Sequence, residues 1–258
     1  MKWSEKRCIV LDMDGTVYLG NTPIAGAVSF IVRHWSECDF YFLTNNTSRS
    51  LNGYIQKLRG MGIYTDRSRM LSPILPLVEY LRKSQLRTLY LVANRDFTCE
   101  LTTAMPELVL AESGAEAVVL AYDTELTYEK LARSALLLQK GLPFFATHPD
   151  LVCPSPEGPL PDVGSMLSLY ETATGRRPDR IFGKPDPLIL SPLFSRYTRE
   201  SMIMVGDRLS TDMQLARNAG IDFALVLSGE AKREDLQGLS YTPTFVLADL
   251  GCAEAYWV

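Results

Sequence analysis

The sequence lacks the features that mark membrane, nucleic-acid-binding or secreted proteins. No apolar run approaches the ~20 residues that cross a bilayer, and the stretch after MKWSEKR is too short for a signal peptide. There is no basic run, and 26 basic against 30 acidic side chains give a formal net charge of -4, which offers no footprint for nucleic acid or anionic lipid. The five cysteines include no CxxC pair, so neither a disulfide framework nor a zinc site is indicated. We therefore expect a cytoplasmic protein with small-molecule partners.

Short apolar runs rich in β-branched and aromatic side chains recur along the 258 residues. Each has the length of a buried strand, and segments with helical spacing lie between them. This alternation predicts an α/β fold with a doubly wound, Rossmann-like parallel sheet. The expected strands are 8–14, 40–44, 89–93, 117–122, 143–147, 201–207 and 223–227.

The spacing of polar clusters at strand ends predicts two domains. About one helix and its turns fit between Asp12 and Thr44, whereas 139 residues lie between Thr44 and Lys184. A helix and a strand need about 40 of these, which leaves a domain-sized stretch. We therefore expect an inserted α/β cap over 84–180 and a catalytic core made of 1–83 and 181–258.

The segment DMDGT (12–16) places two carboxylates, Asp12 and Asp14, at the end of the first expected strand. Gly15 allows a sharp turn there, so that both carboxylates can point into one crevice. Repulsion between them requires a cation or a shifted pKa, and Mg²⁺ prefers carboxylate oxygen. One carboxylate can act as a nucleophile toward phosphorus while the other protonates the leaving oxygen. The alternative is that the pair only caps a turn.

The segment GDRLSTD (206–212) adds two more carboxylates after a late strand. Asp207 follows that strand directly, and Asp212 lies where a helix that ends at Gly220 is expected to begin. Asp212 could simply be a favourable charge at a helix N-terminus, and both roles can hold together. Together with Asp12 and Asp14, a third carboxylate at a neighbouring strand end would complete a cluster of acids that can bind a divalent ion.

A cluster of acids repels phosphate unless donors and cations are close to it. FLTNNTS places Thr44 and Asn45 at a strand end, where hydroxyl, amide and backbone N–H groups can hold phosphoryl oxygens. FGKPDP places Lys184 between Gly183 and Pro185. A lone lysine is ordinarily a solvated surface charge, so Lys184 is weak evidence by itself.

In this order, DMDGT, FLTNN, GKPDP and GDRLSTD closely resemble the four motifs of the haloacid dehalogenase (HAD) superfamily. The insert before GKPDP, with ATHPDLVCPSPEGPLPDVGSM (146–166), resembles the C2-type cap of the NagD and 4-nitrophenyl-phosphatase branch. The resemblance covers residues 8 to about 227, most of the chain. It implies a Mg²⁺-dependent phosphatase that forms an aspartyl-phosphate.

The resemblance also implies roles for individual residues. Asp12 would be the nucleophile, and Asp14 would be the general acid and then the base, with its backbone carbonyl on Mg²⁺. Asp12 and Asp207 would be the carboxylate ligands, with Asp212 a less secure member of the metal site. The phosphoryl group would be held by three residues, Thr44, Asn45 and the catalytic Lys184, which also relieves repulsion around Asp12.

The acid at position 14 argues for phosphate-ester hydrolysis over dehalogenation, because an alkoxide leaving group needs a proton and a halide does not. A phosphotransferase or phosphomutase on the same intermediate, and a catalytically idle binding module of the same fold, stay open as alternatives. The substrate is also open among sugar phosphates, nucleoside monophosphates, phosphoglycolate or glycerol phosphate, and pyridoxal phosphate.

The cap sequence departs from the branch at two places. Members often read ATNPD where this chain has His148, and Pro-Gly-x-Gly where it has the run 161–164, which contains Asp162. These departures affect substrate choice, and His148 could reach the leaving group or be structural. A homodimer through the cap is implied by the resemblance only.

Overall fold

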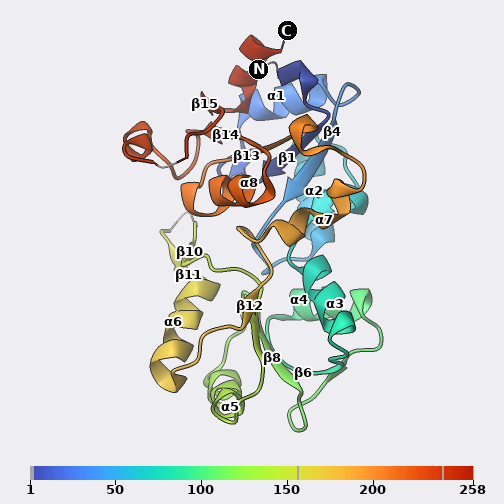
Figure 1. The fold of residues 1–258 in the computed structure, drawn as a ribbon, viewed down its shortest axis with the longest axis vertical. Helices are drawn as coiled ribbons and strands as arrows, with labels where there is room; N and C mark the ends of the chain where they lie inside the picture. Colours follow the sequence, from blue (N-terminus) through green and yellow to red (C-terminus); the bar gives the residue numbers. More distant parts are fainter. Residues whose placement is uncertain (1–2, 156, 240, 258) are drawn as a thin grey trace. The chain divides into compact units, whose positions relative to one another are not determined.

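The computed structural model describes residues 3–155, 157–239 and 241–257, and the chain divides into two compact units (Figure 1). The predicted cap, 84–180, lies within the ranges of the second unit, which also takes in the helix before it. The exact domain boundaries stay a prediction. The first unit comprises Met1–Thr44, Asn52–Leu71 and Lys184–Val258; the second comprises Asn45–Leu51 and Ser72–Gly183.

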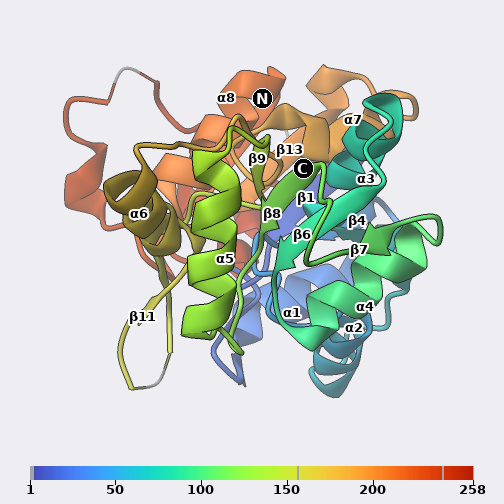
Figure 2. The same cartoon turned by 90° about the horizontal axis from the view of Figure 1, so that it is seen from below.

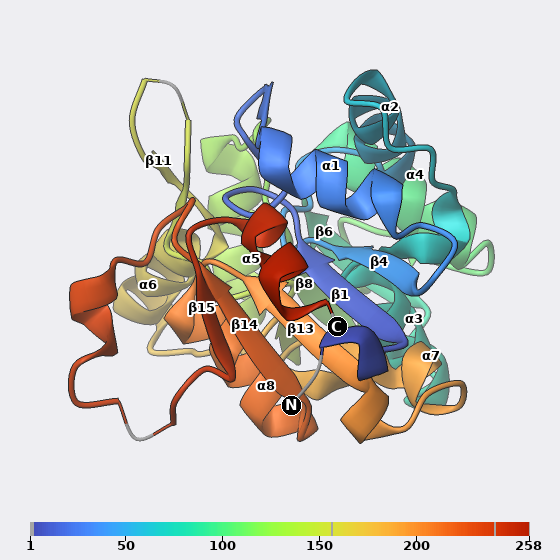
Figure 3. The same cartoon turned by 90° about the horizontal axis from the view of Figure 1, so that it is seen from above.

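The first unit is built on a six-stranded sheet in which every neighbouring pair of strands is parallel (Figure 3). Strands of the N-terminal segment extend the sheet on one side of β1, and strands of the C-terminal segment extend it on the other. The strand order therefore reverses at β1, which is where open parallel sheets bind ligands. The order is β15 (Phe245–Leu247), β14 (Asp222–Val226), β13 (Met202–Gly206), β1 (Cys8–Asp12), β4 (Asp39–Leu43) and β5 (Met70–Leu71).

Helices cover both faces of this sheet, as the burial of consecutive strand residues requires. All five residues of β1 are buried, and Cys8 and Val10 pack in a cluster with residues of α8 (Gln214–Ala219) and α7 (Ser191–Phe194). Helix α1 (Ala25–Arg33) lies on the opposite face (Figure 3). The remaining elements of this unit are α2 (Leu51–Gly60), whose first residue belongs to the second unit, the β2 (Tyr18–Leu19) and β3 (Thr22–Pro23) hairpin, and short 3₁₀ helices over Trp3–Glu5, Arg67–Arg69, Pro187–Leu190, Arg199–Ser201, Arg233–Leu236 and Leu250–Tyr256.

The second unit has its own five-stranded parallel sheet (Figure 2). One face is covered by α3 (Ile74–Lys83) and α4 (Arg95–Ala104), and the other by α5 (Tyr128–Gln139) and α6 (Val163–Thr174). Each face has a separate cluster of buried side chains, so this unit has a core of its own. The strand order is β12 (Arg180–Ile181), β9 (Phe144–Ala146), β8 (Ala117–Leu120), β6 (Thr88–Val92) and β7 (Val109–Leu110), with a separate hairpin of β10 (Val152–Cys153) and β11 (Leu160–Pro161).

The predicted fold class is confirmed. Each of the seven predicted strands overlaps an observed one, and the two sheets with flanking helices give a Rossmann-like core and a second α/β unit. Within the part of the chain that the structure describes, every helix is too short or too polar to cross a membrane.

Candidate active site

The carboxyl ends of the two central strands of the first sheet bring Asp12 and Asp207 side by side. Asp12 is the last residue of β1, Asp207 follows β13, and the two strands pair in parallel with Leu11 opposite Val205. Between them the backbone turns at Gly15, whose φ is +90°. A Cβ on Gly15 would lie 2.3 Å from Oδ2 of Asp207, so this turn needs glycine for both its conformation and its close approach.

A third carboxylate, Asp212, completes the cluster. It lies in a π-helical turn over Leu209–Met213, just before α8. One oxygen from each of Asp12, Asp207 and Asp212 lies within 4.8 Å of the others, and all three side chains are buried. Oδ2 of Asp212 accepts a hydrogen bond from the backbone N–H of Arg208 at 3.1 Å.

One carboxylate oxygen of Asp207 accepts a hydrogen bond, and the other has no partner among the described residues. The backbone N–H of Glu230 donates to Oδ2 at 2.7 Å. Oδ1 is buried and has no hydrogen-bond partner among the described residues. A buried carboxylate oxygen without a partner is costly, and a cation is the kind of group that satisfies it.

The ammonium of Lys184 is buried among these carboxylates. Its Nζ donates to Oδ1 of Asp12 and to Oδ1 of Asp212, the latter at 2.6 Å. The side chain is 3% exposed. Burial alone would lower the pKa of Lys184, but the charges of Asp12 and Asp212 outweigh burial and raise the pKa. The lysine is therefore a fixed positive charge of the site.

Burial also dominates the protonation of the acids. It raises the pKa of Asp12 well above its usual range, with Lys184 opposing the shift and the other two carboxylates adding to it. Burial and the charge of Asp212 raise the pKa of Asp207 to about 6, against the hydrogen bond from Glu230 and the charges of Arg208 and Lys184. Both shifts show that the buried site disfavours ionised carboxylates unless further positive charge is bound.

The cluster fits a divalent cation by its donor set and its charge. Three ionised carboxylates and one ammonium leave two negative charges, which a divalent ion would balance. Hard oxygen ligands are the type that Mg²⁺ and Ca²⁺ prefer. Asp207 contributes the oxygen without a hydrogen-bond partner described above, so this oxygen is available to bind a metal ion.

Asp14 lies apart from the three-carboxylate cluster and is half-buried. Its pKa is raised by burial, although Lys57, the backbone N–H of Gly20 and Arg208 act to lower it. Lys57 lies over the ring of Tyr18, with Nζ 3.5 Å from the ring centroid. The raised pKa makes the carboxyl group of Asp14 better suited to a proton donor than an ordinary exposed aspartate.

The two polar residues after β4 belong to different units. Thr44 is buried at the end of the first sheet, and its backbone N–H donates to Leu71 at 3.1 Å. Asn45 belongs to the second unit, where its carboxamide donates to both oxygens of Asp150 at 3.3 Å. Sequence reasoning did not single out Asp150, because nothing local to ATHPD indicates a partner 105 residues earlier in the chain.

Comparisons with known proteins agree with this fold. Residues 9–105 match the haloacid dehalogenase-like hydrolase family, and residues 181–253 match a HAD-hydrolase-like family. The acid sugar phosphatase of Staphylococcus epidermidis is 31% identical over 250 residues, which cover 95% of this chain and 96% of that protein. The chain therefore belongs to the haloacid dehalogenase-like hydrolase family.

Solved structures indicate the branch of that family. The 4-nitrophenylphosphatase of Thermotoga maritima is 38% identical with a TM-score of 0.91, over 98% of each chain. Glycerol phosphate phosphatase from Mycobacterium tuberculosis, solved in complex with magnesium and with calcium, is 28% identical with a TM-score of 0.88 and covers 98% of this chain; this chain covers 78% and 76% of those two structures. The predictions of a HAD-like enzyme and of its NagD-like branch are thereby confirmed.

Proposed function

We propose that the chain is a phosphatase that hydrolyses small phosphate monoesters with the help of Mg²⁺ and through a phosphoryl group carried on Asp12. The observation that supports this most is the burial of Asp12 against Lys184, beside two further carboxylates at the point where the strand order reverses. The phosphatase names of the similar proteins support the same reaction.

Asp12, Asp207 and Asp212 would hold the metal ion, together with the backbone carbonyl of Asp14. When bound, the ion would supply positive charge that favours ionised carboxylates and neutralises phosphoryl oxygens. Magnesium is proposed because hard oxygen ligands suit it and because a similar phosphatase was solved with it.

The residues would then act in two steps. In the first, Oδ of Asp12 attacks phosphorus, the ester P–O bond breaks, and Asp14 gives its proton to the leaving oxygen. In the second, Asp14 takes a proton from water, the water oxygen attacks phosphorus, and the bond to Asp12 breaks. Thr44, Asn45 and Lys184 would hold the phosphoryl oxygens throughout, with Lys184 also lowering the repulsion between phosphate and carboxylates.

Two alternatives use the same residues. A phosphotransferase or phosphomutase would pass the phosphoryl group to an alcohol instead of water, and an idle binding module would bind phosphate without turnover. Hydrolysis is favoured because the similar proteins are named as phosphatases. A cytoplasmic location and a homodimer stay predictions.

The test is Asp12→Asn, assayed with Mg²⁺ and 4-nitrophenyl phosphate. We expect phosphate release to fall at least ~10³-fold, since the nucleophile is lost. Mass spectrometry of the acid-quenched wild type should find a phosphoryl group on the peptide that contains Asp12. Assays with an added alcohol compare free phosphate with phosphorylated alcohol, and so separate hydrolysis from transfer.

The matched control is Asp39→Asn, at the other end of the same sheet. Asp39 begins β4 and pairs with Arg69 and Tyr197, so its loss should affect stability and not turnover. Wild-type phosphate release by the Asp12→Asn variant would refute the role of Asp12.

A further inference from the structure

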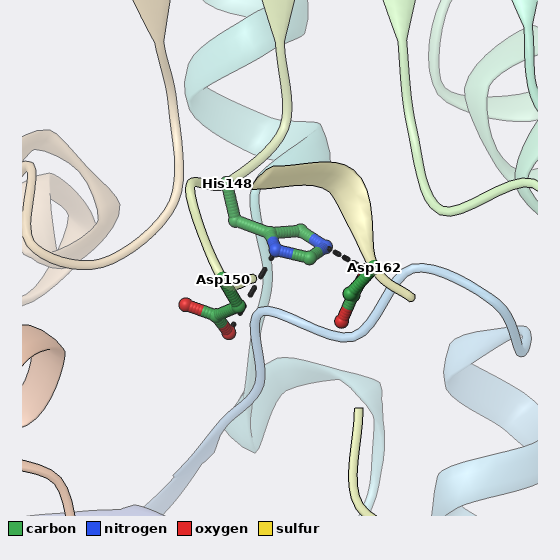
Figure 4. A group of neighbouring side chains, drawn as sticks. All are labelled: His148, Asp150 and Asp162. Atoms are coloured by element: carbon green, nitrogen blue, oxygen red, sulfur yellow. Dashed lines mark ion pairs between the residues drawn. The ribbon is translucent and has the colours of Figure 1, made fainter. Parts of the chain in front are cut away.

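A second group of titratable side chains lies wholly within the second unit (Figure 4). His148 follows β9, and its ring lies between two carboxylates. Nδ1 is 3.7 Å from Oδ2 of Asp150, and Nε2 is 3.6 Å from Oδ1 of Asp162. The imidazole is completely buried, and neither ring nitrogen has a hydrogen-bond partner among the described residues. We call these three residues the His148 bridge.

The geometry favours a bridge over a metal site. The two ring nitrogens of His148 face different carboxylates on opposite sides of the ring (Figure 4). A metal ion would be held on one nitrogen of the imidazole, whereas here each nitrogen faces a carboxylate of its own. The ring fills the space between the two carboxylates and lies within 3.7 Å of an oxygen of each, so it sets the distance between them.

The loops that carry the bridge are tightly fixed. Oδ1 of Asp162 caps α6 by accepting from the N–H of Val163 at 2.7 Å. The N–H of Gly164 donates to the carbonyl of Asp150 at 2.8 Å, and a Cβ on Gly164 would lie 2.3 Å from the carbonyl oxygen of Pro149. The bridge therefore joins the loop after β9 to the N-terminus of α6 at a defined distance.

The same loop contacts the two chain segments that lead to the proposed phosphoryl-binding residues. Asp150 accepts from the carboxamide of Asn45, which directly follows Thr44. Gly183, which directly precedes Lys184, packs so closely that a Cβ there would lie 2.5 Å from Oδ1 of Asn45 and 2.9 Å from Cβ of His148. Both segments are thus in contact with the loop that the bridge fixes.

We propose that His148 is a positioning residue for phosphoryl binding. It holds Asp150, Asp150 orients the carboxamide of Asn45, and the loop supports Gly183 next to Lys184. This inference rests on the function proposed above. The proposal also explains why this chain has a histidine where the branch often has the asparagine of ATNPD. The histidine side chain is longer, and its two nitrogens face two carboxylates at once.

The test compares two substitutions of His148 with one of His34, the other histidine of the chain. His148→Leu keeps the bulk of the side chain and removes both nitrogens, whereas His148→Asn keeps one donor group. His34→Leu is the matched control, because His34 is also buried and lies 3.2 Å from both Glu37 and Glu254. His34 caps the end of α1 that leads to the start of β4, in the first unit.

Each variant is assayed for kcat and KM with 4-nitrophenyl phosphate and Mg²⁺, for Ki with inorganic phosphate, and for Tm. We expect His148→Leu to raise KM and Ki by about tenfold, the effect of one misplaced hydrogen bond to a charged group. kcat should change much less, because Asn45 would hold the same oxygen before and during the reaction. His148→Asn should recover part of the affinity. His34→Leu should lower Tm and leave KM and Ki at wild-type values.

Wild-type KM and Ki in the folded His148 variants would overturn the proposal, and His148→Asn alone suffices if His148→Leu does not fold. Equal rises in KM for the His34 and His148 variants would also overturn it, since the effect would then be general. A metal ion found by elemental analysis in the wild type and lost only from the His148 variants would replace the bridge by a metal site. Failure of the proposed function shows differently, as absence of phosphate release from the wild type.

Discussion

Removal of the divalent cation should make the stability of the protein depend on pH through Asp207. The pKa of this carboxyl group is raised to about 6, first by burial and then by the charge of Asp212. In the unfolded chain the group returns to its ordinary value of 3.8. Between these two values the folded protein binds a proton that the unfolded chain releases, so a rise in pH through 6 removes stability.

The size of the effect follows from the two pKa values. In the absence of metal, Asp207 alone should cost about 1 kcal/mol of unfolding free energy between pH 5 and about pH 7.5. Asp12 shifts in the same direction and adds to the loss. Carboxylates whose pKa is lowered, such as Asp39 and Asp66, titrate below this window and leave the slope unchanged.

The assay is urea unfolding in EDTA at steps of pH, repeated with excess Mg²⁺. In EDTA the wild type should lose stability as the pH rises, and Asp207→Asn should lose less because its amide does not titrate. Excess Mg²⁺ should remove the slope, since a cation binds the ionised carboxylates of the folded state. A wild-type stability in EDTA that is flat or rises from pH 5 to about pH 7.5 would refute the reasoning.

Two further predictions concern the other charged groups. Lys184→Met should destabilise the metal-free protein by about 3 kcal/mol at neutral pH, because two buried carboxylates lose their cation. Urea unfolding measures this loss of stability, and a loss under about 1 kcal/mol would contradict the prediction. Asp14→Asn should lower kcat/KM more for an alkyl phosphate than for 4-nitrophenyl phosphate, because an alkoxide needs a proton donor more than a nitrophenolate does. Equal losses on both substrates would count against Asp14 as the general acid.

Most of the fold could be predicted because its strands are buried on both faces. Such strands appear in the sequence as continuous apolar runs, and all seven predicted runs overlap an observed strand. The two-residue strands β5, β7 and β12 at the sheet edges gave no such signal, because they have too few residues to form a pattern. Their places are set by pairing with neighbours that lie far away in the sequence.

The active-site residues could be predicted where chemistry and local sequence coincide. Asp12 and Asp207 each follow a strand directly, so their meeting at one sheet edge follows from parallel pairing. The contact of Lys184 with Asp212 does not follow in this way, since Asp212 lies in a π-helical turn that no local pattern indicates. For the same reason the sequence did not indicate the partners of Asp212, whose two oxygens accept from Lys184 and from the backbone N–H of Arg208.

The contact of Lys184 with two carboxylates explains why the site needs a lysine instead of an arginine. A compact ammonium has three donors on one atom, so it can bond Asp12 and Asp212 together in a buried place. A planar guanidinium needs more room and would pair with one carboxylate through both of its donor arms. With Asp12 and Asp212 already sharing the lysine, Asp207 is the acid left with an unpaired oxygen. The lysine therefore determines which carboxylate has an oxygen available for the metal ion. Lys184→Met should change the affinity for Mg²⁺ as well as the stability of the protein.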